Sequence, residues 1–63
     1  MPEISMRVIE LINRSGPVSI ASAEEALRVN KYTLRSHFRR LVQEGYLIQL
    51  GRGRATKYAL ASP

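Results

Sequence analysis

The sequence predicts an α+β fold in which three short helices are followed by a C-terminal β-hairpin, in one domain that spans residues 1–63. Three observations predict it. Apolar residues recur at helical spacing over the first two thirds of the chain, residues that start or stop helices separate these stretches, and two β-prone runs flank a glycine-rich segment. A chain of 63 residues has the size of a single small domain.

The first predicted helix covers residues 3–14, where apolar residues recur at helical spacing. Gly16 and Pro17 follow, and neither residue continues a helix well. The next residues, 18–20, are β-prone but too few to form more than a short edge strand. The sequence therefore predicts one amphipathic helix, a sharp stop and at most a short strand.

The second predicted helix has two candidate starts. Ser22 and Glu25 have the spacing of a capping box, in which the serine accepts from the first turn and the glutamate reaches back. The apolar spacing that begins at Ile20 and continues to Leu27 instead favours Ser19 as the N-cap. We favour Ser19, because it places the apolar residues on one side of the helix.

The third predicted helix covers residues 31–44, with Asn30 as its N-cap and Gly45 as the residue that ends it. At 100° per residue this helix has an apolar side and a cationic side. The apolar side carries Leu34, Phe38 and Leu41, which we expect in the core. The opposite side carries Tyr32, Ser36, Arg39 and Gln43, with Arg35 and Arg40 beside them.

The hairpin is predicted from two β-prone runs, residues 46–50 and 55–60, on either side of a segment that alternates glycine with arginine. Tyr58 and Leu60 alternate with Lys57 and Ala59, so we expect them to pack against the first helix. Glycine allows the tip to bend tightly, and the arginines place positive charge there.

Positive charge is concentrated in the second half of the chain. The whole chain has ten basic and five acidic residues, a net charge of +5 and a pI near 10.5. Residues 1–27 hold two basic and four acidic residues, a net charge of −2, whereas residues 28–63 hold eight basic residues and one acidic residue, a net charge of +7. This separation favours a scaffold joined to a surface that contacts an anionic partner.

The composition argues against several classes of protein. The chain has no cysteine, which excludes disulfides and thiolate metal sites. It has one histidine and no aspartate, so we interpret His37 as a packing residue and expect no enzyme activity, no cofactor and no metal site. The N-terminus has no uninterrupted apolar run, so we expect no signal peptide or membrane span and a cytoplasmic, nucleoid-associated location.

Several short stretches together carry a resemblance to a known family. They are the turn Leu27-Arg28-Val29-Asn30, the helix start Thr33-Leu34-Arg35, Leu41, the helix end Glu44-Gly45-Tyr46-Leu47, and the final strand Thr56-Lys57-Tyr58-Ala59-Leu60. With them the sequence resembles a prokaryotic winged helix-turn-helix domain, and its small size is similar to the FaeA-like regulators of fimbrial operons. Arg28 departs from the family, which often has glycine there. A left-handed turn would cost a non-glycine residue about 1 kcal/mol.

The resemblance implies that the third helix is a recognition helix and the hairpin a wing, and the residue types support contact with double-stranded DNA. A major groove admits one α-helix, and arginine can bind guanine through two hydrogen bonds. Lys31 in the first turn opposes the helix dipole, a penalty that a docked phosphate would reverse. The predicted contacts are Lys31, Tyr32, Thr33, Arg35, Ser36, Arg39, Arg40 and Gln43 on the helix, and Arg52, Gly53, Arg54 and Lys57 on the wing.

Other interpretations stay open. The cations could be a solvated surface, the wing could belong to a winged helix that binds an acidic protein, and the chain could bind RNA or nucleoid DNA without specificity. A phosphate-cradling nucleotide loop is disfavoured, because the glycines at the tip lack the Lys-Ser/Thr ending and open no helix. We expect a homodimer or a cooperative assembly on DNA, with Met6, Ile48 and Leu50 as candidate contacts, and no small-molecule effector.

Overall fold

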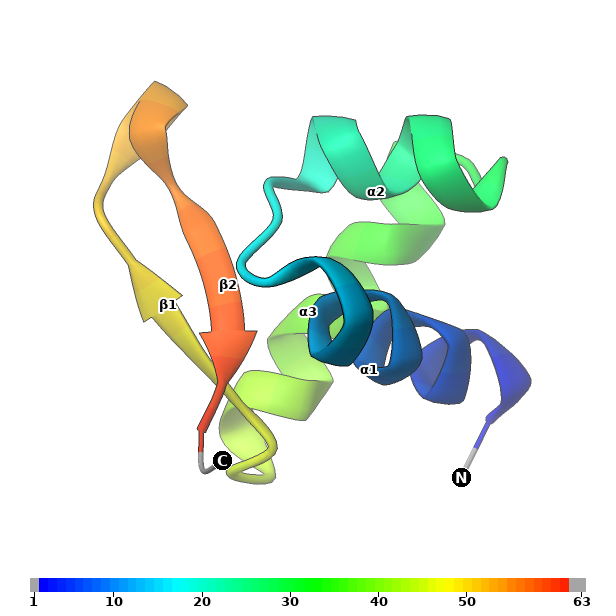
Figure 1. Cartoon of the computed structure of the whole chain (residues 1–63), viewed down its shortest axis with the longest axis horizontal. Coiled ribbons are helices and arrows are strands. Elements are labelled where there is room, and N and C mark those ends of the chain that lie inside the picture. Colours follow the sequence, from blue (N-terminus) through cyan, green and yellow to red (C-terminus); the bar gives the residue numbers. More distant parts are fainter. Residues whose placement is uncertain (1, 62–63) are drawn as a thin grey trace.

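The computed structural model describes residues 2–61 (Figure 1). Within this range three helices precede an antiparallel two-stranded hairpin, as predicted. The elements are α1 (Glu3–Ser15), α2 (Ile20–Leu27), α3 (Lys31–Gln43), β1 (Leu47–Leu50) and β2 (Lys57–Leu60), with a 3-10 turn, η1 (Gly53–Ala55), at the hairpin tip. This α+β topology is consistent with a winged helix.

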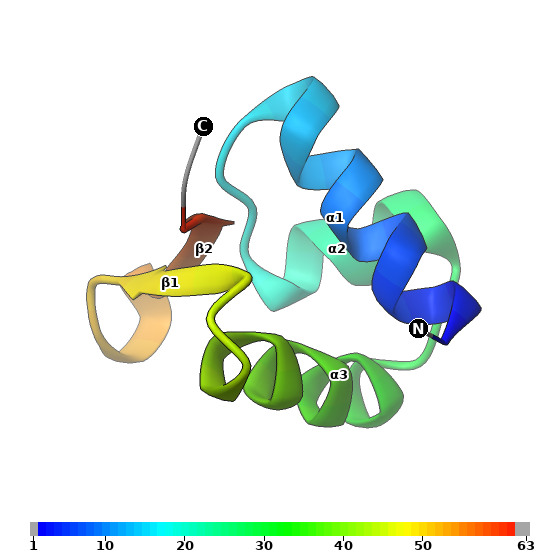
Figure 2. The same cartoon turned by 90° about the horizontal axis from the view of Figure 1, so that it is seen from below.

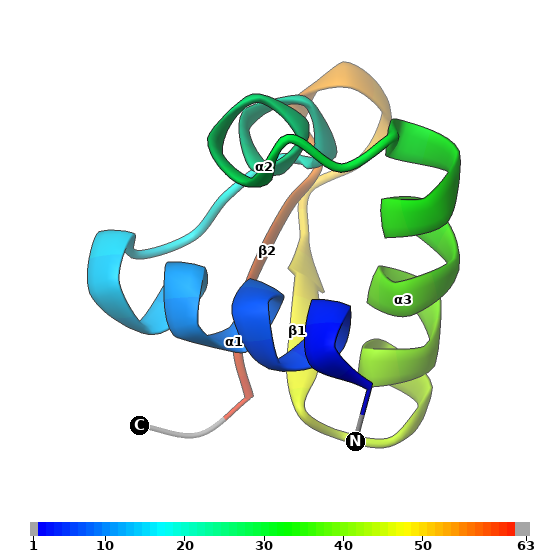
Figure 3. The ribbon, with the colours of Figure 1, turned by 90° about the vertical axis from the view of Figure 1, so that its right-hand side faces the viewer.

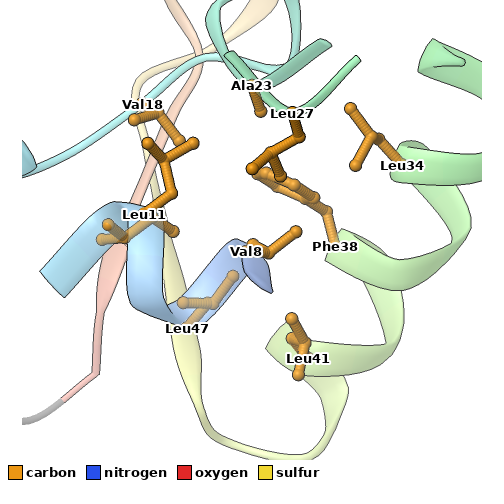
Figure 4. Packing of buried hydrophobic residues seen from close by; sticks show 10 residues of the cluster. Val8, Leu11, Val18, Ala23, Leu27, Leu34, Phe38, Leu41 and Leu47 are labelled. Carbon is orange, nitrogen blue, oxygen red and sulfur yellow. The ribbon is translucent and has the colours of Figure 1, made fainter. Parts of the chain in front are cut away.

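The core lies where the three helices meet the inner side of the hairpin. Phe38 and Leu34 of α3 are fully buried, together with Val8 of α1 and Leu47 of β1 (Figure 4). The ring of Tyr58 in β2 meets the Phe38 ring edge to face, with 4.7 Å between the ring centroids. The predicted apolar side of α3 is therefore the centre of the core. Tyr58 packs on Phe38, and β2 also contacts α1.

The end of α1 is set by Gly16. The helix continues to Ser15, one residue beyond the prediction, and the Ser15 hydroxyl donates to the Leu11 carbonyl over 2.9 Å. Gly16 follows with φ of +87°, and its N–H donates to the carbonyl of Ile12. A positive φ is easy for glycine, so the chain turns sharply here.

Ser19 is the N-cap of α2, as favoured from the sequence. Its Oγ accepts the N–H of Ser22 over 3.0 Å, and the helix begins at Ile20. At the other end Arg28 adopts the left-handed conformation, with φ of +58° and ψ of +39°. The guanidinium of Arg7 donates to the Leu27 carbonyl over 3.0 Å and so ties α1 to the last turn of α2. The turn thus has the left-handed shape although the residue there is arginine and not glycine.

Both ends of α3 agree with the sequence to within one residue. Asn30 Oδ1 accepts the N–H of Tyr32 over 2.7 Å, which confirms Asn30 as the N-cap. The helix ends at Gln43, with Glu44 as its C-cap, and Gly45 is left-handed at φ of +85°. The chain then turns directly from α3 into β1 (Figure 2).

The hairpin strands are shorter than the sequence predicts. Leu47 pairs with Leu60 and Leu50 with Lys57, so Tyr46 and the segment 55–56 lie outside the strands. Part of the second predicted strand is used for the tip, where η1 tightens the turn. Gly51 is required there, because its φ is +80° and a Cβ would lie 2.9 Å from the Ala55 carbonyl oxygen.

The predicted edge strand at residues 18–20 contracts to a single bridge. The N–H of Val18 donates to the Tyr58 carbonyl over 3.0 Å, and the N–H of Tyr58 donates back over 2.8 Å. The pairing does not extend to Ser19, because Ser19 is the N-cap of α2 and the helix begins at the next residue. The bridge nevertheless joins the start of α2 to the middle of β2, and this contact fixes the hairpin relative to the helices.

The hairpin tip and α2 lie at one end of the molecule, and α1 lies toward the other end (Figures 1 and 3). The α3 helix extends along one side between these ends (Figure 3). Among residues 2–61 no helix combines the length and the apolar character that crossing a bilayer requires.

Candidate nucleic-acid interface

An open hollow of about 570 Å³ lies between α3, the N-terminal end of α2 and the hairpin. Three segments that are distant in sequence form it, and the Val18–Tyr58 bridge holds two of them together. The lining residues are Ser19, Ile20 and Ala21 from α2 and its cap, Arg35, Arg39, Val42 and Gln43 from α3, and Gln49, Gly53, Arg54, Thr56 and Tyr58 from the hairpin.

Three arginines line this hollow: Arg35 and Arg39 from α3, and Arg54 from the hairpin tip. All three are exposed, and no acidic residue lines the hollow. Within residues 2–61 the ion pairs shorter than 4 Å involve other arginines. Because like charges that share a concave surface raise its positive potential, an anion that enters the hollow is attracted by all three.

The predicted contact residues of α3 divide between two sides of the helix. Arg35, Arg39 and Gln43 follow each other at intervals of four residues and share the side that faces the hollow. Tyr32 lies one turn before Arg35 and is 68% exposed. The ammonium of Lys31 lies 5.4 Å from the centre of that ring, so these two residues form the N-terminal end of the same side.

Arg40 lies away from this side. Its Nε donates to Glu44 Oε2 over 2.9 Å, and it lines a smaller, separate pocket with Pro2 and Ser5. One step along a helix rotates a side chain by 100°, so Arg40 and Arg39 point in different directions. The structure therefore does not bring Arg40 together with the arginines of the hollow.

Two further residues predicted on α3 interact with each other. The hydroxyl of Ser36 donates to the carbonyl of Thr33 over 3.0 Å, and both residues are exposed. In this conformation the Ser36 hydroxyl already donates its hydrogen, so toward another molecule it can act only as an acceptor. Neither residue lines the hollow.

The predicted wing contacts are all exposed, but only some of them border the hollow. Gly53 and Arg54 lie in η1 and line it. Arg52 comes just before η1 in an extended conformation, and Lys57 pairs with Leu50 at the start of β2. The tip thus offers one arginine to the hollow and two further cations near its rim.

The start of α3 carries a carboxylate that the sequence did not reveal. The N–H of Lys31 donates to Glu24 Oε2 of α2 over 3.1 Å. An acidic group at a helix N-terminus stabilises the helix dipole, so Glu24 offsets the unfavourable position of Lys31 without a docked phosphate. Seven residues separate the partners, and only the angle between α2 and α3 brings them together.

A second unpredicted contact lies on the far side of α3. The hydroxyl of Ser5 hydrogen bonds with His37 Nδ1 at 2.9 Å, and Ser5 is 1% exposed. His37 is half-buried, as expected for a packing residue. The available signal was Ser5 itself, a polar residue that shares the apolar side of α1 with Val8.

No protein-family model matches the sequence, and a search of curated proteins finds no match either. The class is therefore defined by the fold alone: three helices followed by an antiparallel hairpin, a winged-helix-like domain with a basic hollow between its third helix and its hairpin.

Proposed function

We propose that this chain is a sequence-specific double-stranded DNA-binding protein, a transcriptional regulator of the prokaryotic winged helix-turn-helix kind. One observation supports the proposal most: Arg35 and Arg39 of α3 and Arg54 of the hairpin tip line a single hollow that contains no acidic residue. Duplex DNA suits this arrangement, because its grooves lie beside its phosphate strands. A helix in a groove and a hairpin on the neighbouring strand can therefore contact it together.

In this proposal α3 enters the major groove. The groove is about 12 Å wide and accepts one α-helix, and α3 has 13 residues with an exposed polar side. Arg35 and Arg39 have the length and the planar donor groups to bind O6 and N7 of guanine. Gln43 can pair with adenine in the same way, and Tyr32 at the helix start is suited to phosphate or sugar.

The hairpin tip contacts the DNA beside α3. Arg54 and Arg52 are carried by a turn with two left-handed glycines, Gly51 and Gly53, so the backbone can approach a phosphate strand closely. Arginine is also favoured in a narrow minor groove, which lies next to the major groove that α3 occupies. We infer that the tip binds the backbone or the adjacent minor groove.

The N-terminal end of α2 completes the proposed surface. Ser19, Ile20 and Ala21 line the hollow together with the arginines. A helix N-terminus has a partial positive charge, so this end adds to the positive potential and introduces no acidic side chain. The proposed surface therefore has arginines on α3 and on the hairpin, and the partial positive charge of a helix N-terminus on α2.

Selection of binding sites from random duplexes, followed by affinity measurements on the selected site and on a scrambled site, tests the proposal. Arg35→Ala should reduce the preference for the selected site by about 1–3 kcal/mol, whereas Arg54→Ala should weaken both duplexes alike. On duplexes that carry a single site, Arg14→Ala is the matched control, because Arg14 is an exposed cation on α1 that does not line the hollow. A selection that yields no preferred sequence would favour a non-specific binder, and failure to bind any duplex would leave a protein-interaction domain.

A further inference from the structure

A second concave surface lies between α1 and the start of the hairpin, away from the basic hollow. It is a largely apolar groove of about 560 Å³ and shares no lining residue with the hollow. Met6 and Tyr46 on its walls are 57% and 47% exposed, which is high for large apolar side chains. The lining residues are Met6, Ile9, Glu10 and Asn13 from α1, with Gly45, Tyr46 and Leu60.

Charges alternate in sign along the exposed side of α1 beside this groove. Glu3, Arg7, Glu10 and Arg14 follow each other at intervals of four, three and four residues, so they form one stripe along the helix. All four are exposed; within one copy Arg14 lies 3.7 Å from Glu10, and Arg7 donates to the Leu27 carbonyl. Reversing the direction of such a stripe exchanges positive for negative positions, so the stripe is complementary to an antiparallel copy of itself.

We propose that this face binds a second copy of this chain, with the two α1 helices antiparallel about a two-fold axis that passes between Val8 and Ile9. This axis places Glu3 opposite the partner's Arg14 and Arg7 opposite the partner's Glu10. A parallel arrangement would instead oppose like charges. Self-complementarity of one patch is the property that a two-fold symmetric interface requires.

In the same two-fold arrangement, a side chain of each copy fills the groove of the other. Each Met6 lies at the level of the partner's Leu11, between the partner's Ile9 and Asn13, which line the groove. A flexible, apolar methionine is suited to an irregular groove of this kind. The apolar and the charged parts of the face therefore require the same alignment, and this agreement selects a second copy as the occupant.

The size of the face indicates a weak dimer. A standard interface buries about 800 Å² on each partner, nearly a fifth of the 4553 Å² surface of this chain. A 13-residue helix is only about 20 Å long and 10 Å wide, a strip of about 200 Å², so α1 and the groove together bury less than a standard interface does. Two copies on neighbouring DNA sites would associate more readily, because the duplex raises their local concentration. This use of the dimer rests on the proposed DNA-binding function.

Sedimentation equilibrium without DNA, at protein concentrations up to about 1 mM, tests the interface directly. We expect a monomer–dimer equilibrium whose Kd rises at least tenfold in Met6→Glu. Ile48→Glu is the matched control, because Ile48 is 44% exposed on the hairpin but does not line the groove, and its dimer Kd should stay within twofold. A thermal melt of each variant confirms that it is folded.

The charge pattern gives a second test that distinguishes antiparallel from parallel pairing. Arg14→Glu places like charges opposite each other and should weaken the dimer severalfold, whereas the double variant Glu3→Arg, Arg14→Glu should restore it. The chain has no cysteine, so introduced thiols report single contacts. Glu3→Cys mixed with Arg14→Cys should form a disulfide dimer. Glu3→Cys alone should not, because its two copies lie about 16 Å apart along the helix axes.

Three results would overturn this interface: a chain that stays monomeric at 1 mM, a dimer that Ile48→Glu disrupts and Met6→Glu does not, or a disulfide dimer of Glu3→Cys alone. None of these measurements uses DNA. A monomer that still binds its duplex would therefore remove the interface and leave the proposed function intact, and a dimer that binds no duplex would do the reverse.

Discussion

Replacing Glu24 by glutamine should weaken the fold and strengthen DNA binding at the same time. The carboxylate of Glu24 accepts the N–H of Lys31 at the start of α3. Glutamine can keep a neutral hydrogen bond there, but the interaction of the charge with the helix dipole is lost, a change of about 0.3–1 kcal/mol. In a domain of this size that loss lowers Tm by about 2–8 °C.

The same carboxylate repels DNA phosphates near the start of α3. A phosphate about 10 Å away is repelled by about 0.4 kcal/mol in water, so Glu24→Gln should tighten duplex binding about twofold at low salt. Calorimetry and fluorescence anisotropy with a labelled duplex measure the two effects. Glu25→Gln is the control, because Glu25 is the exposed neighbour on the same helix. If both variants behaved alike in Tm and in Kd, Glu24 would have no special role at the start of α3.

Four further substitutions test the local structure, each by thermal or urea unfolding. Ser19→Ala should destabilise the fold by about 1 kcal/mol through loss of the α2 cap, and Ser22→Ala by clearly less; the reverse order would restore the capping box as the helix start. Arg28→Gly should stabilise by about 0.5–1 kcal/mol, because Arg28 has a positive φ; a loss of stability would contradict a strained turn. Gly51→Ala should destabilise by at least about 1 kcal/mol, since both φ and the Ala55 carbonyl oppose a side chain; an unchanged midpoint would refute the tip geometry.

The features that the sequence predicted well are those decided by neighbours in the chain. Ser19, Asn30 and Gly45 each act on a helix end within three residues of themselves, so their residue types are enough to place the boundaries of α2 and α3. The apolar side of α3 was equally clear, because its spacing is a property of one helix. The strands were overestimated, since the tight tip at η1 uses residues that are β-prone by composition.

The features that the sequence could not predict depend on the angles between elements. Two hydrogen bonds, from Lys31 to Glu24 and from Arg7 to the Leu27 carbonyl, join separate helices. No local sequence pattern predicts either of them. The same holds for the proposed DNA surface. Helical spacing is enough to place Arg35 and Arg39 on one side of α3. That Arg54 lines the same hollow depends on where the hairpin lies, and the bridge at Val18 fixes that position.

The most direct test of the basic hollow is the salt dependence of duplex binding, measured by anisotropy from low to moderate ionic strength. If the cations of α3 and the hairpin neutralise about five phosphates between them, the log–log slope is near −4.5. On a duplex that carries a single site, Arg54→Ala should reduce the magnitude of that slope by about 0.9, whereas Arg14→Ala should leave it unchanged. A duplex affinity that does not respond to salt, or that changes equally in both variants, would contradict DNA binding through this surface.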